Sequence, residues 1–176
     1  MNSSDWNKIW SKLGIGKELV EACTLPLQDN AVDLVSAGTD ATGREQFVTP
    51  MTLQCWQEME AAAGSDGIGL LIVSAYRSVE YQCQLIQNKL DKGQQIDDIV
   101  KVNAIPGFSE HHSGCAIDIT TDECEPLTEA FDQTSAFRWL EQNAAGFRFA
   151  MTYPRDNSYN IIYEPWHWAC LEHSPL

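Results

Sequence analysis

The chain has few basic residues. Of its 176 residues, 11 are Lys or Arg and 25 are Asp or Glu, so the formal net charge is −14 at pH 7. Nucleic acids and anionic membrane surfaces both attract proteins through basic patches. We therefore expect neither a nucleic acid nor a membrane as a partner.

Long apolar runs are also missing. No stretch approaches the ~20 apolar residues that a membrane helix needs, and the first residues lack the basic and apolar regions of a secretory signal. This favours a cytoplasmic protein, or a periplasmic or extracellular one if a signal has been removed. No repeat or linker divides the chain. With 44% hydrophobic residues and six tryptophans, it can bury a core as one globular domain, and we expect a monomer.

The cysteines lack a regular pattern. They stand at positions 23, 55, 83, 115, 124 and 170, and no two form a C-x-x-C pair. A chain of this length does not need disulfide bridges to fold. We expect free, mostly buried thiols that do not ligate zinc.

Hydrophobic periodicity and turn residues predict an α+β fold, in which a central antiparallel sheet carries helices packed on one side. Helices are expected from Ser4, as N-cap, to Gly14, from Thr49-Pro50 to about Ala63, from the cap Ser78 to about Asp91, and from Thr134 to Ala145. Strands are expected at residues 69–75, 115–119, 147–151, 159–163 and 166–170, and a loop at 104–110.

Residues 15–48 give the least information about secondary structure. Gly38 to Gly43 predict a turn, and Arg44 is a possible substrate contact. We expect residues 1–44 to form a helical and irregular segment that packs on a catalytic domain at 45–176.

Two segments supply groups that suit a metal. Ser109 to Asp118 reads S-E-H-H-S-G-C-A-I-D, and Glu164 to His167 reads E-P-W-H. Catalytic zinc commonly takes three His, Asp or Glu ligands and leaves a fourth position open. His111, Asp118 and His167 could fill this role, which would leave Glu164 free to act on a water molecule.

The spacing supports this interpretation. Gly114 permits a tight backbone passage before a short strand, on which Ala116 and Asp118 face the same side. A small residue beside the acid leaves room for a ligand. Pro165 favours an extended Glu164, so Glu164 and His167 could approach one metal from the same segment.

Together with Ser74-Ala-Tyr-Arg-Ser78 and Glu80-Tyr-Gln82, these motifs resemble the D-alanyl-D-alanine carboxypeptidases of the VanY type. The wider group includes VanX dipeptidases, lysostaphin, some phage endolysins and the zinc domain of hedgehog proteins. The resemblance covers about residues 45 to 170 and follows the family's S-x-H-x-x-G-x-A-x-D and E-P-W-H patterns. It implies a hedgehog/DD-peptidase-like fold.

Carried over residue by residue, the resemblance implies one zinc per chain, held by His111, Asp118 and His167. It implies Glu164 as the catalytic base, and Arg77 as a residue that binds substrate and steadies the oxyanion. Gln82 and Ser109 match positions that contact the peptide.

The implied reaction is removal of a C-terminal D-alanine from a peptidoglycan-type peptide by attack of a metal-activated water. L,D-carboxypeptidase, D-Ala-D-Ala dipeptidase and endopeptidase activities would use the same groups. A hedgehog-like domain would hold zinc and bind a protein without turnover, because the fold alone does not establish catalysis.

Structural alternatives exist for several of these residues. Arg77 could form an ordinary salt bridge, and Gln82 and Ser109 could cap local backbone. His112 and His173 are interpreted as structural histidines. Tyr76 and Trp166 are interpreted as packing residues of the pocket wall.

Overall fold

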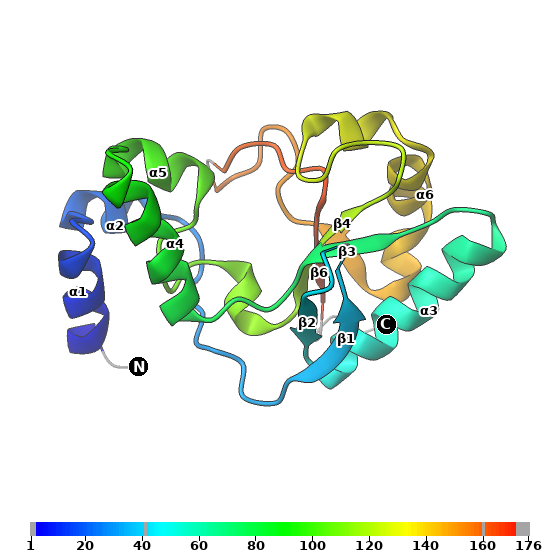
Figure 1. Cartoon of the computed structure of the whole chain (residues 1–176), viewed down its shortest axis with the longest axis horizontal. Coiled ribbons are helices and arrows are strands. Elements are labelled where there is room, and N and C mark those ends of the chain that lie inside the picture. Colours follow the sequence, from blue (N-terminus) through cyan, green and yellow to red (C-terminus); the bar gives the residue numbers. More distant parts are fainter. Residues whose placement is uncertain (1–2, 41, 160, 172–176) are drawn as a thin grey trace.

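The computed structural model describes residues 3–40, 42–159 and 161–171 (Figure 1). The helices are α1 (Ser3–Lys12), α2 (Lys17–Ala22), α3 (Pro50–Ser65), α4 (Val79–Asp91), α5 (Ile96–Val102) and α6 (Ser135–Asn143), with the short 3-10 helices η1 (Glu110–Ser113), η2 (Glu129–Gln133) and η3 (Ala144–Phe147). The strands are β1 (Val35–Thr39), β2 (Glu45–Val48), β3 (Leu71–Ser74), β4 (Ala116–Thr120), β5 (Phe149–Met151) and β6 (His167–Cys170). The α+β class is confirmed.

The central sheet is antiparallel, with the strand order β3-β4-β6-β5. Its register pairs Ser74 with Asp118, and Asp118 with His167. Directly opposed residues of an antiparallel pair have Cβ atoms about 5 Å apart. This register therefore brings three polar side chains from distant parts of the sequence into one row across the sheet.

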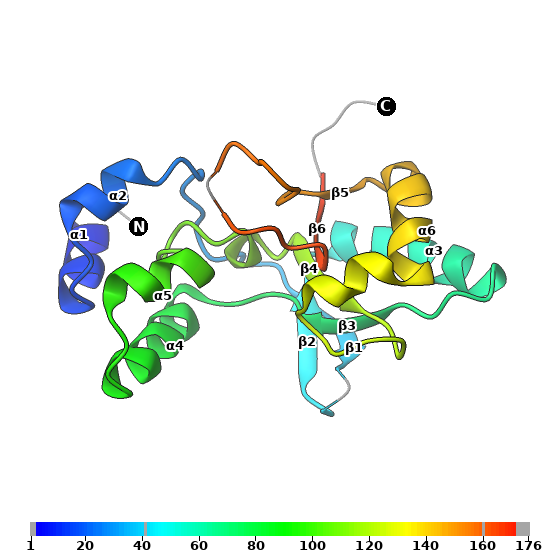
Figure 2. The same ribbon diagram turned by 90° about the horizontal axis from the view of Figure 1, so that it is seen from above.

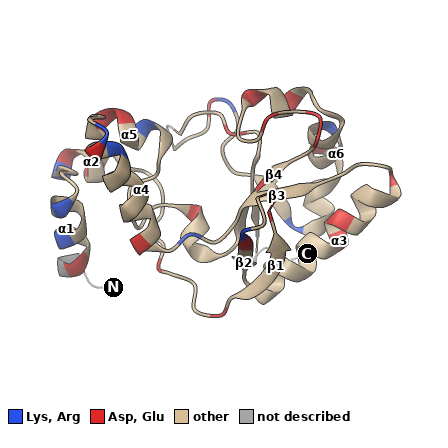
Figure 3. Ribbon diagram, viewed as in Figure 1, with Lys and Arg blue, Asp and Glu red and all other residues tan. Residues whose placement is uncertain are grey.

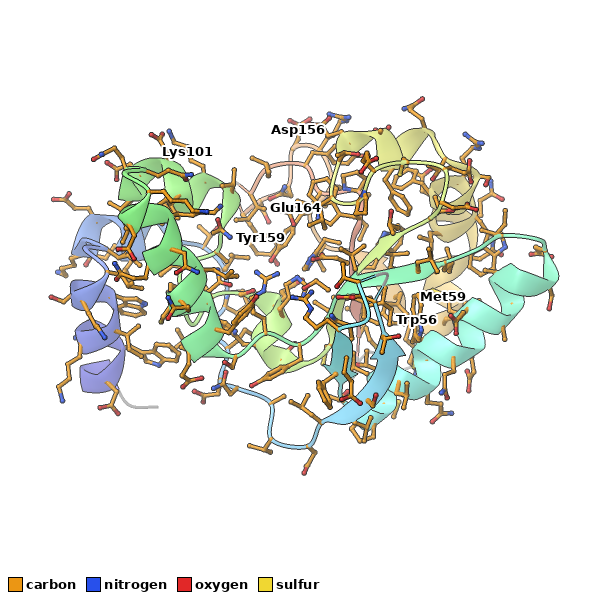
Figure 4. All side chains as sticks on the ribbon, viewed as in Figure 1. Trp56, Met59, Lys101, Asp156, Tyr159 and Glu164 are labelled. Atoms are coloured by element: carbon orange, nitrogen blue, oxygen red, sulfur yellow. The ribbon has the colours of Figure 1, made fainter. Side chains whose placement is uncertain are left out.

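The helices gather at the two ends of the molecule. Helices α1, α2, α4 and α5 lie at one end and α3 and α6 at the other, with the sheet between them (Figures 1 and 2). Each end has its own apolar cluster. One joins the sheet to α3 and α6 and includes Trp56, Ile117 and Trp168, whereas the other includes Leu13, Ile86 and Ile99. Trp56 and Met59 extend from α3 toward the sheet (Figure 4).

Side-chain caps fix the start of three helices. Thr49 accepts a hydrogen bond from Thr52 N, Ser78 from Tyr81 N, and Thr134 from Phe137 N. Each bond satisfies one of the backbone N–H groups that a helix start leaves without a partner. The predicted starts of α3, α4 and α6 are confirmed, whereas Ser4, the predicted cap of the first helix, lies within α1.

The segment before α3 forms a second, two-stranded sheet in which β1 and β2 pair antiparallel. The predicted turn at Gly38 to Gly43 overlaps the end of β1, and the expected domain boundary at 44/45 lies directly before β2. Further toward the N-terminus, Gln28 N donates to Gly107 O (2.6 Å) and Ala31 N to His112 O (2.8 Å). Backbone hydrogen bonds thus join the segment before β1 to the loop before η1 and to η1 itself.

Several expected elements differ from the structure. Residues 161–163 form no strand, because Asn157 Nδ2 donates to both Pro154 O (2.9 Å) and Ile161 O (2.8 Å) and so closes a loop. Strand β4 begins one residue later than predicted, and β5 and β6 are shorter. The predicted buried strand at 69–75 is only partly buried, since Leu71 is 45% exposed. Helices α2 and α5 were not predicted.

The cysteines at positions 23, 55, 83, 115, 124 and 170, all among the described residues, form no disulfide bridge, as predicted. Burial is less complete than predicted, because Cys55 and Cys170 are buried and the others are half-buried. None of the described helices is long and apolar enough to cross a membrane.

Candidate metal centre and catalytic cleft

His111 enters the site from η1. Gly114 ends this turn with φ 71°, a left-handed conformation, and a Cβ there would lie 3.0 Å from Leu34 Cδ2. Only glycine meets both demands without strain. The His111 Nδ1 donates to Ala75 O at 2.7 Å, which leaves Nε2 facing Asp118 Oδ2 at 3.3 Å.

His167 faces Asp118 from the neighbouring strand. Its Nδ1 lies 3.0 Å from Asp118 Oδ1, while its Nε2 lies 2.9 Å from Glu110 Oε2. The ring of Tyr153 stacks on the imidazole with centroids 4.6 Å apart. His167 is 2% exposed, so these contacts hold its ring in a dry environment.

The geometry of this group fits a tetrahedral metal. One ligand atom from each of His111, Asp118 and His167 can be chosen so that all lie within 4.8 Å of one another. Tetrahedral zinc with bonds of 2.0–2.1 Å separates its ligand atoms by about 3.3 Å. His111 Nε2 lies 3.3 Å from Asp118 Oδ2, and His167 Nδ1 lies 3.0 Å from Asp118 Oδ1. The three predicted ligands are therefore brought together in a suitable arrangement.

Glu110 is a further carboxylate of the centre that the sequence did not identify. Besides its contact with His167, its Oε2 accepts a hydrogen bond from Thr152 Oγ1 at 2.7 Å. A carboxylate on the outer nitrogen of a ligating histidine fixes the tautomer and raises the basicity of the inner nitrogen. No local motif marks this role, because Glu110 reaches His167 only through the fold.

Glu164 lies beside the group without belonging to it. His167 N donates to Glu164 O at 3.0 Å, which forms a turn that places the Glu164 Oε2 3.9 Å from His167 Nδ1. Figure 4 shows Glu164 in the middle of the molecule, between α5 and β4. Burial raises the pKa of its carboxyl to about 7. A nearly neutral pKa suits a group that accepts and returns a proton.

The three buried groups of the centre have shifted pKa values. Burial lowers the pKa of His111. Burial alone would also lower that of His167, but hydrogen bonds to Asp118 and Glu110 raise the pKa of His167 to about 10. Burial would raise the pKa of Asp118, yet His111 and His167 hold it well below its usual value. The site therefore favours positive charge beside an ionised Asp118.

Arg77 is fixed at the edge of the centre. Its Nη1 donates to Gln82 Oε1 at 3.0 Å and its Nη2 to Ser74 Oγ at 3.4 Å, while its backbone N donates to His111 O at 3.0 Å. Among the described residues no carboxylate oxygen lies within 4.0 Å of its guanidinium. The ordinary salt bridge left open by the sequence is therefore not formed there.

Gln82 is fully buried and donates to Ala104 O at 2.7 Å while it accepts from Arg77. Its amide therefore holds the Arg77 guanidinium, and Gln82 is not among the residues that line the cleft described below. Ser109, in contrast, lines the cleft described below. It makes no side-chain cap bond to η1, which leaves its predicted substrate contact open.

The other predictions have mixed outcomes. His112 is structural as predicted, since its Nδ1 lies 2.6 Å from Arg77 O and its Nε2 accepts from Gly107 N at 3.1 Å. Arg44 does not line the cleft but pairs with Asp40 at 3.0 Å. Trp166 lines the cleft wall and Tyr76 does not. His173 lies outside the described residues.

A cleft of about 430 Å³ opens above the centre. Its floor carries Arg77, Ser109, His111, Asp118, Glu164 and His167. Its walls are mostly apolar but also carry two lysines and one asparagine. The wall residues are Lys89, Lys101, Val102, Asn103, Ala104, Leu127, Tyr153, Ile161, Ile162 and Trp166. This size and lining suit a short peptide.

The family model of the VanY D-alanyl-D-alanine carboxypeptidases matches residues 45–172. The chain belongs to this family. The enzyme named D-alanyl-D-alanine carboxypeptidase of Enterococcus faecium is 32% identical over 136 residues, which cover 74% of this chain and 40% of that protein. YodJ of Bacillus subtilis (strain 168), named as a candidate carboxypeptidase, is 33% identical over 129 residues, covering 70% of this chain and 46% of YodJ. The chain spans about half or less of the length of these relatives.

Solved structures agree with this assignment. The LD-carboxypeptidase LdcB superposes with a TM-score of 0.72 at 29% identity, covering 80% of this chain and 69% of LdcB. A mutant of the vancomycin-resistance D,D-pentapeptidase VanY in complex with Zn(II) has a TM-score of 0.62 at 25% identity, covering 84% of this chain and 87% of that structure. The hedgehog/DD-peptidase-like fold is thereby confirmed for this family member.

Proposed function

We propose that the protein is a zinc-dependent carboxypeptidase that removes the C-terminal D-alanine from peptidoglycan-type peptides. The observation that carries the proposal is the position of Glu164, a buried carboxyl beside the His111, Asp118 and His167 group at the floor of a peptide-sized cleft. The VanY relatives support both the metal and the substrate class.

His111 Nε2, Asp118 and His167 Nδ1 would hold the zinc, because the other nitrogen of each imidazole is already bonded to Ala75 O or Glu110. When bound, zinc supplies a Lewis acid that polarises the scissile carbonyl and acidifies a water molecule. Glu164 would take the proton from the attacking water and return it to the leaving amine, which matches the roles of a general base and acid.

Arg77 would stabilise either the oxyanion that forms from the scissile carbonyl or the terminal carboxylate of the peptide. Its planar guanidinium is held by Gln82 and Ser74, so donors already point in a fixed direction. Ser109 lines the same floor and would contact the peptide backbone.

The same groups would serve related reactions. An L,D-carboxypeptidase acting on tetrapeptide stems is favoured by the superposition with LdcB. A dipeptidase is suggested by a relative in Enterococcus gallinarum named as both D-Ala-D-Ala dipeptidase and D-Ala-D-Ala carboxypeptidase, which is 28% identical over 137 residues. An endopeptidase would accept peptides without a free C-terminus. The alternative of another class is a zinc-holding binding module. In such a module the buried Glu164 would have no chemical role.

The test is mass spectrometry of defined muropeptides after incubation with the purified, zinc-loaded protein. We expect loss of one D-alanine from pentapeptide stems, one zinc per chain by elemental analysis, and reversible inactivation by a chelator. Loss of D-alanine from tetrapeptide stems alone would establish the L,D-activity instead. No cleavage of any muropeptide by a zinc-loaded protein would overturn the proposed function.

A further inference from the structure

The cleft wall formed by α4 and α5 concentrates positive charge. Lys89 of α4 and Lys101 of α5 line it, together with Arg77 at the floor. Among the described lining residues the acids are Asp118 and Glu164, and both belong to the metal centre. In a chain with a net charge of −14, this wall is an exception.

The two lysines are not equivalent. Lys101 pairs with Asp98 at 2.8 Å, and both side chains are about two-thirds exposed. Figure 3 shows both signs of charge on α5, and Figure 4 shows Lys101 on that helix. Lys89 is half-buried, and its Nζ donates to the neutral Asn103 Oδ1. Among the described residues no carboxylate oxygen lies within 4.0 Å of it.

An ammonium group has three donors, and the contact with Asn103 uses one of them. The remaining donors of Lys89 are available to a group in the cleft that its side chain lines. Asn103 lines the same cleft, and its side-chain amide adds donors beside the ammonium. The pair therefore offers donors to an anion, and Lys89 forms no ion pair within 4.0 Å in the part of the chain that the structure describes.

The separation of Lys89 from Gln82 along α4 follows from helix geometry. Gln82 and Lys89 are seven residues apart on α4, and seven residues advance an α-helix by about 10 Å while they return to nearly the same face. That face contacts the segment 103–104 at both positions, and Gln82 holds Arg77. An extended peptide advances about 3.3 Å per residue, so an advance of about 10 Å along α4 corresponds to about three peptide residues.

We propose that Lys89 and Asn103 form a subsite for a second carboxylate of the substrate, carried two to four residues on the amino-terminal side of the scissile bond. This inference rests on the proposed function, because it assumes a peptide that runs from the metal centre along α4. It names the substrate class as acidic peptides, in which Arg77 and Lys89 each meet one negative charge.

The experiment uses acetylated pentapeptides ending in D-Ala-D-Ala that carry a single glutamate or glutamine two, three or four residues before the scissile bond. Turnover is measured with the wild type, and binding by calorimetry with the zinc-loaded Glu164→Gln protein. We expect the glutamate peptide to be preferred about tenfold at one of these positions, as for a partly buried ion pair with a charged hydrogen bond. In Lys89→Gln the preference falls to about one, and in Lys89→Arg it remains.

Lys92→Gln is the matched control, because Lys92 follows α4, is exposed and does not line the cleft. A tenfold preference that survives in Lys89→Gln, or no preference in the wild type, overturns the subsite. Charge-dependent binding through Lys89 without turnover of any peptide supports the subsite and overturns the proposed function. Turnover without a preference for the glutamate peptide supports the proposed function and overturns the subsite.

Discussion

Gln46 and His111 bind the two polar backbone groups of the same residue, Ala75. The Ala75 N–H donates to Gln46 Oε1 at 3.0 Å, and the Ala75 carbonyl accepts from His111 Nδ1 at 2.7 Å. Gln46 in turn donates to Asp40 Oδ2 at 2.9 Å. The β1–β2 hairpin therefore supports the metal centre through a chain of hydrogen bonds, although the hairpin contributes no residue to the group that could hold a metal.

Gln46→Leu should lower both stability and metal affinity. The variant leaves the buried Ala75 N–H without its partner, which costs about 1–3 kcal/mol, and it removes one of the two bonds that hold the residue whose carbonyl orients His111. Zinc affinity should fall about tenfold, as for other groups that orient a ligand. Chemical denaturation and a competitive zinc titration measure the two effects. Gln54→Leu on the exposed side of α3 is the control, and unchanged zinc affinity in Gln46→Leu would show that Gln46 supports only the fold.

Glu110→Gln should weaken zinc binding and leave the fold intact. The amide can still accept from His167 Nε2, but it loses the negative charge that raises the basicity of Nδ1. We expect a 10–100-fold loss of zinc affinity, which is the usual effect of removing such a carboxylate. Glu18→Gln on exposed α2 is the control for charge alone. Equal zinc affinity of the Glu110→Gln variant and the wild type would argue against this role.

Glu164→Gln should retain zinc while turnover falls by about 10²–10⁴-fold, because it removes the proton acceptor and keeps the shape.

Burial raises the pKa of Glu164 to about 7 without metal, and a nearby cation favours the carboxylate, so the working pKa should be below 7. Since the base works deprotonated, kcat/KM of the wild type should rise with pH through that value. Residual activity of the variant should lack this acidic limb, and a retained limb would assign it to another group.

Arg77→Lys and Gln82→Leu should lower activity through one shared interaction. Lysine keeps the charge but loses the planar fork of donors, and Gln82→Leu removes the acceptor that holds the Arg77 Nη1. We expect each variant to lose about tenfold or more in kcat/KM with zinc affinity unchanged. The double variant should lose little more than the worse single variant, because residues that act as a unit are not additive. Fully additive losses would separate Gln82 from Arg77.

Much of the local structure follows from the sequence alone. Thr49-Pro50, Ser78 and Thr134 each start a helix, because a side-chain oxygen in a suitable position satisfies a free N–H of the first turn. Gly114 ends η1 because only glycine tolerates both its φ and its close neighbours. The group of His111, Asp118 and His167 could also be predicted, since residue types and order restrict it strongly.

The supporting contacts depended on tertiary structure. Glu110 reaches His167, and Gln46 reaches Ala75, across 57 and 29 positions of the chain. No local pattern encodes such contacts. They result from the sheet register and from the packing of the β1–β2 hairpin against the segment after β3. The strand expected at residues 159–163 was wrong for a related reason, since Asn157 closes that segment into a loop. The residue types of the metal centre could be predicted from the sequence. Their orientation depends on long-range hydrogen bonds that only the folded chain forms.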